Sequence, residues 1–132
     1  MRENLNNHGR VTGRLTADPV VRPNANGSLT IRFTVAARNS WKDTDGTVHA
    51  QYLPLIAYIP ARSARNFDRN VYAMLHKGDK ITVSYTVMNN NYTDKNGERH
   101  YELALQAQTV MFEESKSTVD ERAARRAEAE PA

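Results

Sequence analysis

The stretch KITVSYTVMNNNYTDKNGERHYELALQAQTVMF, residues 80–112, predicts two long β-strands joined by a hairpin. Apolar and polar residues alternate from Ile81 to Val87 and again from Tyr101 to Ala107, which is the period of a half-buried strand. Residues 93–97, TDKNG, are typical of a type I turn with a G1 bulge, because Asn and Gly tolerate a positive φ. Both arms exceed the usual strand of about five or six residues, so the hairpin should extend past the body of the domain.

The far part of this hairpin carries Tyr92, on the same predicted face as Met88 and Asn90. Three asparagines precede the tyrosine, so the arm has little to bury there except the ring. An exposed ring on a projecting arm is either a dimer contact or a surface on which a flat group can stack.

The chain of 132 residues predicts one domain with a real core. It has no cysteine, which excludes a disulfide framework and a thiolate metal site. No segment approaches the roughly 18 apolar residues of a membrane span, and no apolar run follows the N-terminus, so we expect a cytoplasmic protein.

The net charge of +3 is unevenly placed. Residues 1–112 hold 14 Lys and Arg against 9 Asp and Glu, whereas residues 113–132 hold 4 against 6. A basic body suits a polyanionic partner, although many basic domains bind none.

Three further strands are expected before the hairpin. Residues 8–16 form the first, in which Gly13 indicates a bulge or a bend. Residues 29–38 form the second, with an apolar face and a basic face directed to solvent. Residues 51–59 form the third, where Pro54 should lie at an edge or a bulge because it has no N–H group.

The connections complete the predicted fold. Asp18-Pro19 and residues 22–27 are typical of loops and turns, whereas apolar residues at helical spacing predict a helix over 60–76. The fold class is therefore all-β, a five-stranded OB-fold Greek-key barrel with one helix between strands three and four and a long hairpin between strands four and five. Residues 1–112 would be this domain and residues 113–132 a flexible charged tail, in which Thr118 could cap a short helix with little to pack.

Five segments in this order resemble the bacterial-type single-stranded DNA-binding proteins, over roughly residues 5–112. The resemblance begins with NHGRVTGRL and DPVVR and is specific because the segments occur in sequence on an OB-like pattern of strands. The matching segments are residues 7–15 with 18–22, 36–41, 52–58, 75–79 and 92–97.

The resemblance implies that bases stack on aromatic rings at four positions, while arginine and lysine contact phosphate. The pattern of residues agrees, because flat rings lie among cations on one predicted face, and rings stack without reading sequence. Without the resemblance, the tyrosines of the third strand could be partly buried core residues and the tryptophan a loop anchor. The candidate binding residues are Trp41, Tyr52, Tyr58, Tyr92, Arg10, Arg14, Arg32, Arg38 and Lys42.

The chain departs from the family pattern in several places. Residues 89–91 are asparagines where the family usually carries Arg or Lys, Pro54 replaces a polar residue, and Tyr85 replaces a glycine. The family's tail ordinarily ends in an acidic tip with Pro-Phe, whereas this sequence ends EAEPA. Recruitment of replication or repair proteins by that route is therefore doubtful.

Enzymatic function is not expected. The four histidines fall on separate elements without metal-ligand spacing, no phosphate loop or nucleophile motif is present, and no cofactor is implied. Asp43 and Asp45 suit a turn with Gly46. A nuclease on an OB scaffold is the enzymatic alternative, and a primosome-type protein-interaction module is the non-enzymatic one. The resemblance also implies a homo-oligomer, a tetramer built as a dimer of dimers, which would cover exposed strand edges.

Overall fold

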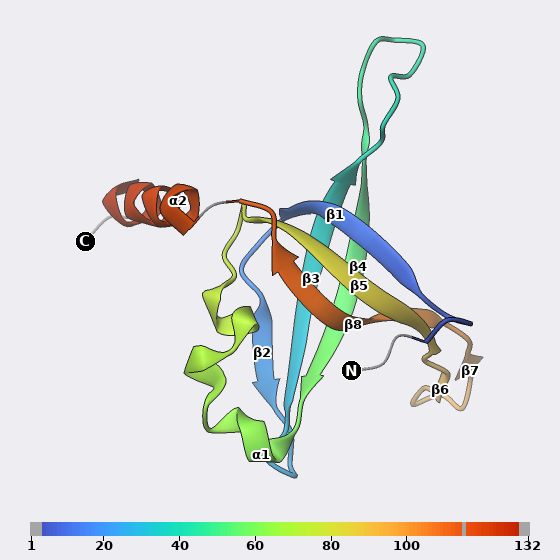
Figure 1. Cartoon of the computed structure of the whole chain (residues 1–132). Helices are drawn as coiled ribbons and strands as arrows, with labels where there is room; N and C mark the ends of the chain where they lie inside the picture. The colour runs from blue at the N-terminus through green and yellow to red at the C-terminus, as the bar shows by residue number, and fades with distance from the viewer. Residues whose placement is uncertain (1–3, 115, 130–132) are drawn as a thin grey trace.

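A computed structural model describes residues 4–114 and 116–129. Six strands form one sheet in the order β1-β5-β8-β4-β3-β2, and β1 also pairs with β3, which closes five strands into a barrel (Figure 1). The predicted OB-fold barrel is thereby confirmed. In chain order the elements are β1 (Gly9–Leu15), β2 (Val20–Pro23), β3 (Leu29–Arg38), β4 (Ala50–Ile59), α1 (Ala61–Ala64), η1 (Phe67–Arg69), η2 (Val71–Met74), β5 (Lys80–Asn89), β6 (Tyr92–Thr93), β7 (Arg99–His100), β8 (Leu103–Phe112) and α2 (Lys116–Ala129).

The barrel interior is filled by the apolar residues of the predicted parity. Ile31 and Val35 of β3, Leu55 of β4, and Ile81 and Val83 of β5 are fully or almost fully buried. Successive side chains of a strand point to opposite faces, so this burial places the alternate residues of β3 and β4 on the outside of the barrel.

Gly13 lies where β1 leaves β5 and begins to pair with β3. A Cβ atom at position 13 would lie 2.2 Å from the carbonyl oxygen of Ala36. The expected irregularity is therefore a close approach of two backbones that only glycine permits.

Pro54 lies in β4 beside β3. The strand on the other side, β8, pairs with β4 only at Leu55 and Ile56. At Pro54 the strand β4 thus has one paired neighbour, which confirms the expectation of a local edge.

The helical segment predicted over residues 60–76 consists of three short pieces rather than one helix. Asn70 separates η1 from η2, because its backbone is extended and its side-chain oxygen accepts a hydrogen bond from the Tyr72 N–H at 3.0 Å. Asparagine competes with helical hydrogen bonds in this way. As a result Tyr72 is buried beside Phe33, with ring centroids 5.7 Å apart, whereas Met74 is half exposed.

The β5–β8 hairpin keeps one register from Tyr85 out to its tip. Its ladder is interrupted after Asn89, but the Asn90 N–H still donates to the Glu102 carbonyl at 2.9 Å, and β6 and β7 resume the pairing. Gly97 has φ +82° and its N–H donates to the Asp94 carbonyl at 3.1 Å, which confirms the predicted turn.

The C-terminal helix α2 is tied to the barrel, whereas sequence analysis predicts a flexible tail from residue 113. Arg122 binds both Asp79 and Glu114, and Arg126 donates to the Lys77 carbonyl at 2.8 Å. The predicted tail residues 130–132 lie outside the described residues. In the part of the chain that the structure describes, no helix has the length and apolar composition needed to cross a membrane.

Candidate nucleic-acid interface

The outer face of β3 and β4 carries two exposed tyrosines. Partners directly opposite in an antiparallel pair share a face, and the register places Tyr52 opposite Ala36 and Tyr58 opposite Thr30. Tyr52 is 67% exposed and Tyr58 is 56% exposed. The alternative that these tyrosines belong to the core is therefore wrong.

Arg32 lies between the two tyrosines on this face, opposite Ile56. The Arg32 side chain is exposed, as the alternation of β3 predicts. One flat surface thus combines rings that can stack with a cation that can contact phosphate.

A groove of about 400 Å³ borders this face and is shared with the hairpin. The parallel pairing of Ile56 with Gln106 places the outer faces of β4 and β8 side by side. Residues of β3 and β4 therefore line the groove together with residues at the base of the projecting arm. Its lining includes Arg32, Thr34, Pro54 and Ile56 from the first pair of strands, and Asn90, Glu102, Leu103 and Leu105 from the hairpin.

Tyr92 lies on the arm beyond this groove, directly opposite His100. The two rings are stacked, with centroids 4.8 Å apart and an interplanar angle of 14°. The Tyr92 hydroxyl donates to Glu102 at 3.3 Å, and this nearby carboxylate raises the pKa of Tyr92, so the phenol stays protonated. The Tyr92 side chain is nevertheless 42% exposed, which leaves surface for a second flat partner.

Asp94 holds the imidazole of His100 from the turn. His100 Nε2 lies 2.8 Å from Asp94 Oδ2, and this hydrogen bond is the main cause of the lowered pKa of Asp94. The other carboxylate oxygen accepts the backbone N–H groups of Asn96 and Glu98 at 2.9 and 3.0 Å. The turn therefore determines where the imidazole lies.

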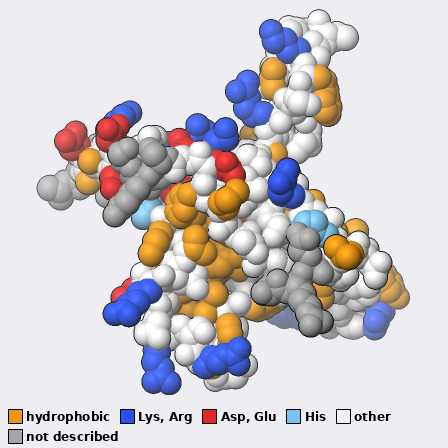
Figure 2. Space-filling view, viewed as in Figure 1, with side chains coloured by type: hydrophobic (Ala, Val, Ile, Leu, Met, Phe, Trp, Pro, Cys, Tyr) orange, Lys and Arg blue, Asp and Glu red, His pale blue; other side chains and the backbone are white. Residues whose placement is uncertain are grey.

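Arg38, Trp41 and Lys42 are exposed at the far end of the β3–β4 hairpin. This arm projects from the barrel, and Figure 2 shows basic and apolar side chains along it (Figures 1 and 2). Trp41 is 61% exposed and, within the described chain, stacks on no other ring. The alternative of a buried loop anchor is therefore wrong.

The β3–β4 arm changes register before its tip. The Asn39 N–H donates to the His49 carbonyl, whereas the Asp43 N–H donates to the Thr47 carbonyl. Between these bonds, residues 40–42 face Val48 alone. Trp41 is thereby displaced from the ladder, which accounts for its exposure.

The two predicted cations of β1 are placed differently. Arg10 is exposed opposite Ser84, on the part of the barrel formed by β1 and β5. Arg14 donates to the Gly78 carbonyl at 2.9 Å and to Glu114 at 3.2 Å. Arg14 therefore contacts the C-terminal segment, but its side chain stays 53% exposed, so the expected contact with phosphate remains a prediction.

Sequence reasoning missed two candidate residues. Arg22 lies on β2 opposite Thr30, so it shares the face of Tyr58, but the prolines around β2 suggested a loop. Tyr101 was expected on the apolar face of a strand, yet it is 73% exposed, with the Arg99 guanidinium 5.6 Å from its ring centroid. The turn at residues 93–97 could have indicated that Tyr101 is exposed, because residues so near the tip of the hairpin arm lie beyond the barrel and have no core to pack against.

Comparison with known proteins agrees with this arrangement. The model of the Single-strand binding protein family matches residues 6–113. The chain belongs to this family. The matched range contains every barrel strand and both projecting arms, and it ends before α2.

Several members of the family are similar to this chain at about 30% identity. The chain is 29% identical over 110 residues to single-stranded DNA-binding protein 1 of Staphylococcus aureus, covering 83% of this chain and 67% of the relative. It is 29% identical over 107 residues to single-stranded DNA-binding protein A of Bacillus subtilis, covering 81% and 59%. It is 32% identical over 107 residues to single-stranded DNA-binding protein 3 of Listeria innocua, covering 80% and 62%. The match therefore spans about two thirds of these relatives' length.

Proposed function

We propose that this protein binds single-stranded DNA without sequence preference. The observation that carries the proposal is the set of exposed rings on one outer face and its two arms, in a chain of the single-strand binding family. Several exposed aromatic side chains gathered on one face indicate an interaction surface, and every base offers a flat face on which such rings can stack.

Stacking and charge have separate roles in this proposal. Bases stack on Tyr52 and Tyr58 along the β3–β4 face, on Tyr92 at one arm and on Trp41 at the other. Cations beside these rings contact phosphate and release counterions, which makes affinity depend on salt. The proposed phosphate contacts are Arg32, Arg38 and Lys42, with Arg22 from β2 in addition to the predicted set. Arg10 contributes longer-range attraction from β1.

The protein acts by binding and protecting single strands in replication, recombination or repair, and not as an enzyme. Turn chemistry accounts for the two aspartates of the β3–β4 arm, since Asp45 accepts the Thr47 N–H at 2.9 Å and Asp43 pairs with His49. A protein-interaction module is not favoured, because the family whose model matches the chain is that of single-strand binding proteins.

We further propose that the protein forms a homo-oligomer, a tetramer built as a dimer of dimers. Large apolar side chains on the outer surface support this, among them Leu103, which is 73% exposed, and Met111, which is 57% exposed. Light scattering at micromolar concentration tests the proposal, and a monomer would contradict it.

The test of the function uses the intrinsic fluorescence of Trp41, the one tryptophan of the chain. Titration with oligo-dT should quench this emission to saturation, because a stacked base deactivates the excited indole. Duplex DNA at the same phosphate concentration should quench it much less. Equal responses to duplex and single strand, or no binding of oligo-dT, would contradict the proposal.

A further inference from the structure

The two projecting arms end in the same nine-residue pattern. Residues 41–49 read WKDTDGTVH and residues 92–100 read YTDKNGERH. In both, an aromatic residue comes first, Asp third, Asp or Asn fifth, Gly sixth and His ninth.

The backbones of the two tips agree as closely as the sequences. Gly46 and Gly97 have φ of +81° and +82°, and each donates its N–H to the backbone carbonyl of the aspartate three residues earlier, at 2.9 and 3.1 Å. This geometry explains the aspartate and the glycine, which such turns favour. It explains neither the histidine nor the aromatic residue, because both lie outside the turn.

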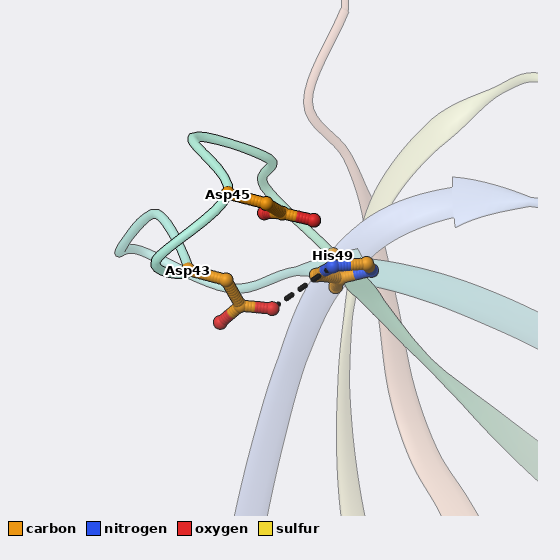
Figure 3. Close-up of side chains that lie close together, drawn as sticks. All are labelled: Asp43, Asp45 and His49. Carbon is orange, nitrogen blue, oxygen red and sulfur yellow. Dashed lines mark ion pairs between the residues drawn. The ribbon is translucent and has the colours of Figure 1, made fainter.

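The histidine binds the aspartate in both arms. His49 Nε2 lies 2.9 Å from Asp43 Oδ2 (Figure 3), and His100 Nε2 lies 2.8 Å from Asp94 Oδ2. The arms differ in how the histidine lies relative to the aromatic residue. His100 lies flat against the ring of Tyr92, whereas the change of register in the other arm displaces Trp41, and among the described residues no aromatic ring stacks on His49.

We propose that His100, held by Asp94, is a positioning residue for Tyr92 in the binding of single-stranded DNA. The imidazole covers one face of the tyrosine ring, so that a base stacks on the opposite face without first ordering the side chain. The bond from the Tyr92 hydroxyl to Glu102 limits the remaining tilt of the ring. This inference rests on the proposed function.

The two arms provide a matched control. His49→Ala and His100→Ala both remove a histidine that binds a turn aspartate, so they change charge alike, but only His100→Ala removes a ring from beneath an aromatic residue. His100→Ala should weaken oligo-dT binding about three- to tenfold. His49→Ala should change it less than about twofold, since no ring pair is lost.

Rescue and coupling distinguish positioning from general disruption. His100→Phe keeps a flat ring opposite Tyr92 and should restore affinity to within about twofold of wild type. In a Tyr92→Ala background, His100→Ala should have no further effect, because the residue then has nothing to position. Without DNA, the Tyr92 ring protons should move downfield by NMR in His100→Ala but not in His100→Phe.

Each result has a defined meaning. Wild-type affinity in His100→Ala, an equal loss in His49→Ala, failure of His100→Phe to rescue, or an undiminished loss in the Tyr92→Ala background would overturn the positioning role alone. A wild-type protein that does not bind oligo-dT would overturn the proposed function and this inference with it.

Discussion

Arg122 on α2 binds Asp79, a carboxylate with no exposed surface just before β5. Arg122 Nη1 lies 2.9 Å from Asp79 Oδ1, and its Nη2 lies 2.8 Å from Glu114. A buried carboxylate is costly without a partner, so this arginine joins the helix to the barrel by a contact whose loss leaves a charge uncompensated.

Replacement of Arg122 should therefore destabilise the whole domain. Arg122→Ala should lower the free energy of unfolding by about 1 to 3 kcal/mol, less than for a fully buried pair, because Asp79 keeps the hydrogen bond from the His76 N–H. Chemical denaturation measures the change. Arg125→Ala is the control, since Arg125 makes an exposed 3.8 Å pair with Glu121, and it should cost less than about 0.5 kcal/mol. Equal effects of the two variants would show that α2 is not held through Arg122.

The same cluster predicts a loss of stability in acid. Hydrogen bonding to Arg122 is the main cause that lowers the pKa of Glu114 from its ordinary 4.5 to about 2. As the pH falls, the Glu114 carboxylate therefore becomes protonated in the unfolded chain before it does in the folded one. Its contribution to the free energy of unfolding is complete above about pH 4.5 and is lost as the pH falls toward 2. Urea denaturation between about pH 6 and 3 should show a shallower decline for Glu114→Gln than for wild type. If stability falls with pH equally steeply in wild type and in Glu114→Gln, Glu114 is not the source of the loss in acid. Glu128→Gln, on the exposed end of α2, serves as the control.

Gly9 is fitted to the ring of Tyr85. A Cβ at position 9 would lie 2.5 Å from ring atoms of Tyr85. Gly9→Ala should cost about 1 to 3 kcal/mol through overpacking. In a Tyr85→Ala background the cost should nearly vanish, and a double-mutant cycle by denaturation measures this coupling. An equal cost in both backgrounds would point to the backbone of β1 instead.

Variants of rings and of cations should differ in their salt dependence. Tyr58→Ala or Trp41→Ala should weaken binding of single strands by about 1 to 3 kcal/mol for any sequence, and should leave the slope of log affinity against log salt unchanged. Arg32→Ala or Arg38→Ala should make that slope shallower by up to about 0.7. Fluorescence anisotropy with labelled oligonucleotides at several salt concentrations separates the two effects. If Tyr58→Ala and Trp41→Ala both bind as wild type, the interface lies on another face of the barrel.

A cation added beside the groove should strengthen binding. Asn90 lines the groove at the base of the hairpin arm, so Asn90→Lys should raise affinity at low salt and steepen the salt slope by about 0.7. Ala124→Lys adds the same charge at an exposed position of α2, none of whose described residues lines the groove, and should have a smaller effect. Equal gains would indicate attraction by net charge alone.

Local patterns in the sequence predicted what depends on local chemistry. The parity of Ile31, Leu55 and Ile81 identified the buried faces, and Gly97 identified the hairpin turn, since alternation and positive φ leave direct traces in the residue order. β2 was missed because four residues beside two prolines give no period to detect. The break at Asn70 was missed because a capping bond competes with a helical pattern that is otherwise intact.

Features that depend on distant partners could not be predicted. Asp79 and Arg122 are far apart in the chain, and an arginine among exposed charges has no local signature of an ion pair with a buried residue. The exposure of Trp41 follows from a change of register, which requires knowledge of both strands. The contact of Arg14 with Glu114 likewise depends on β5, which lies between β1 and β8 in the sheet and pairs with both.

The register of the two arms also determines how readily each one opens. Around Tyr92 the amide hydrogens of Asn90 and Asp94 are bonded across the arm in the register of β5 and β8, so they should exchange with solvent slowly. The amide hydrogens of residues 40–42, which face a single residue, should exchange with solvent as fast as those of an ordinary loop. Tyr92 therefore lies on a segment that is hydrogen-bonded across its arm, whereas Trp41 lies where the pairing of its arm is interrupted. The two rings should differ in how fast they reorient, even though their turns are alike.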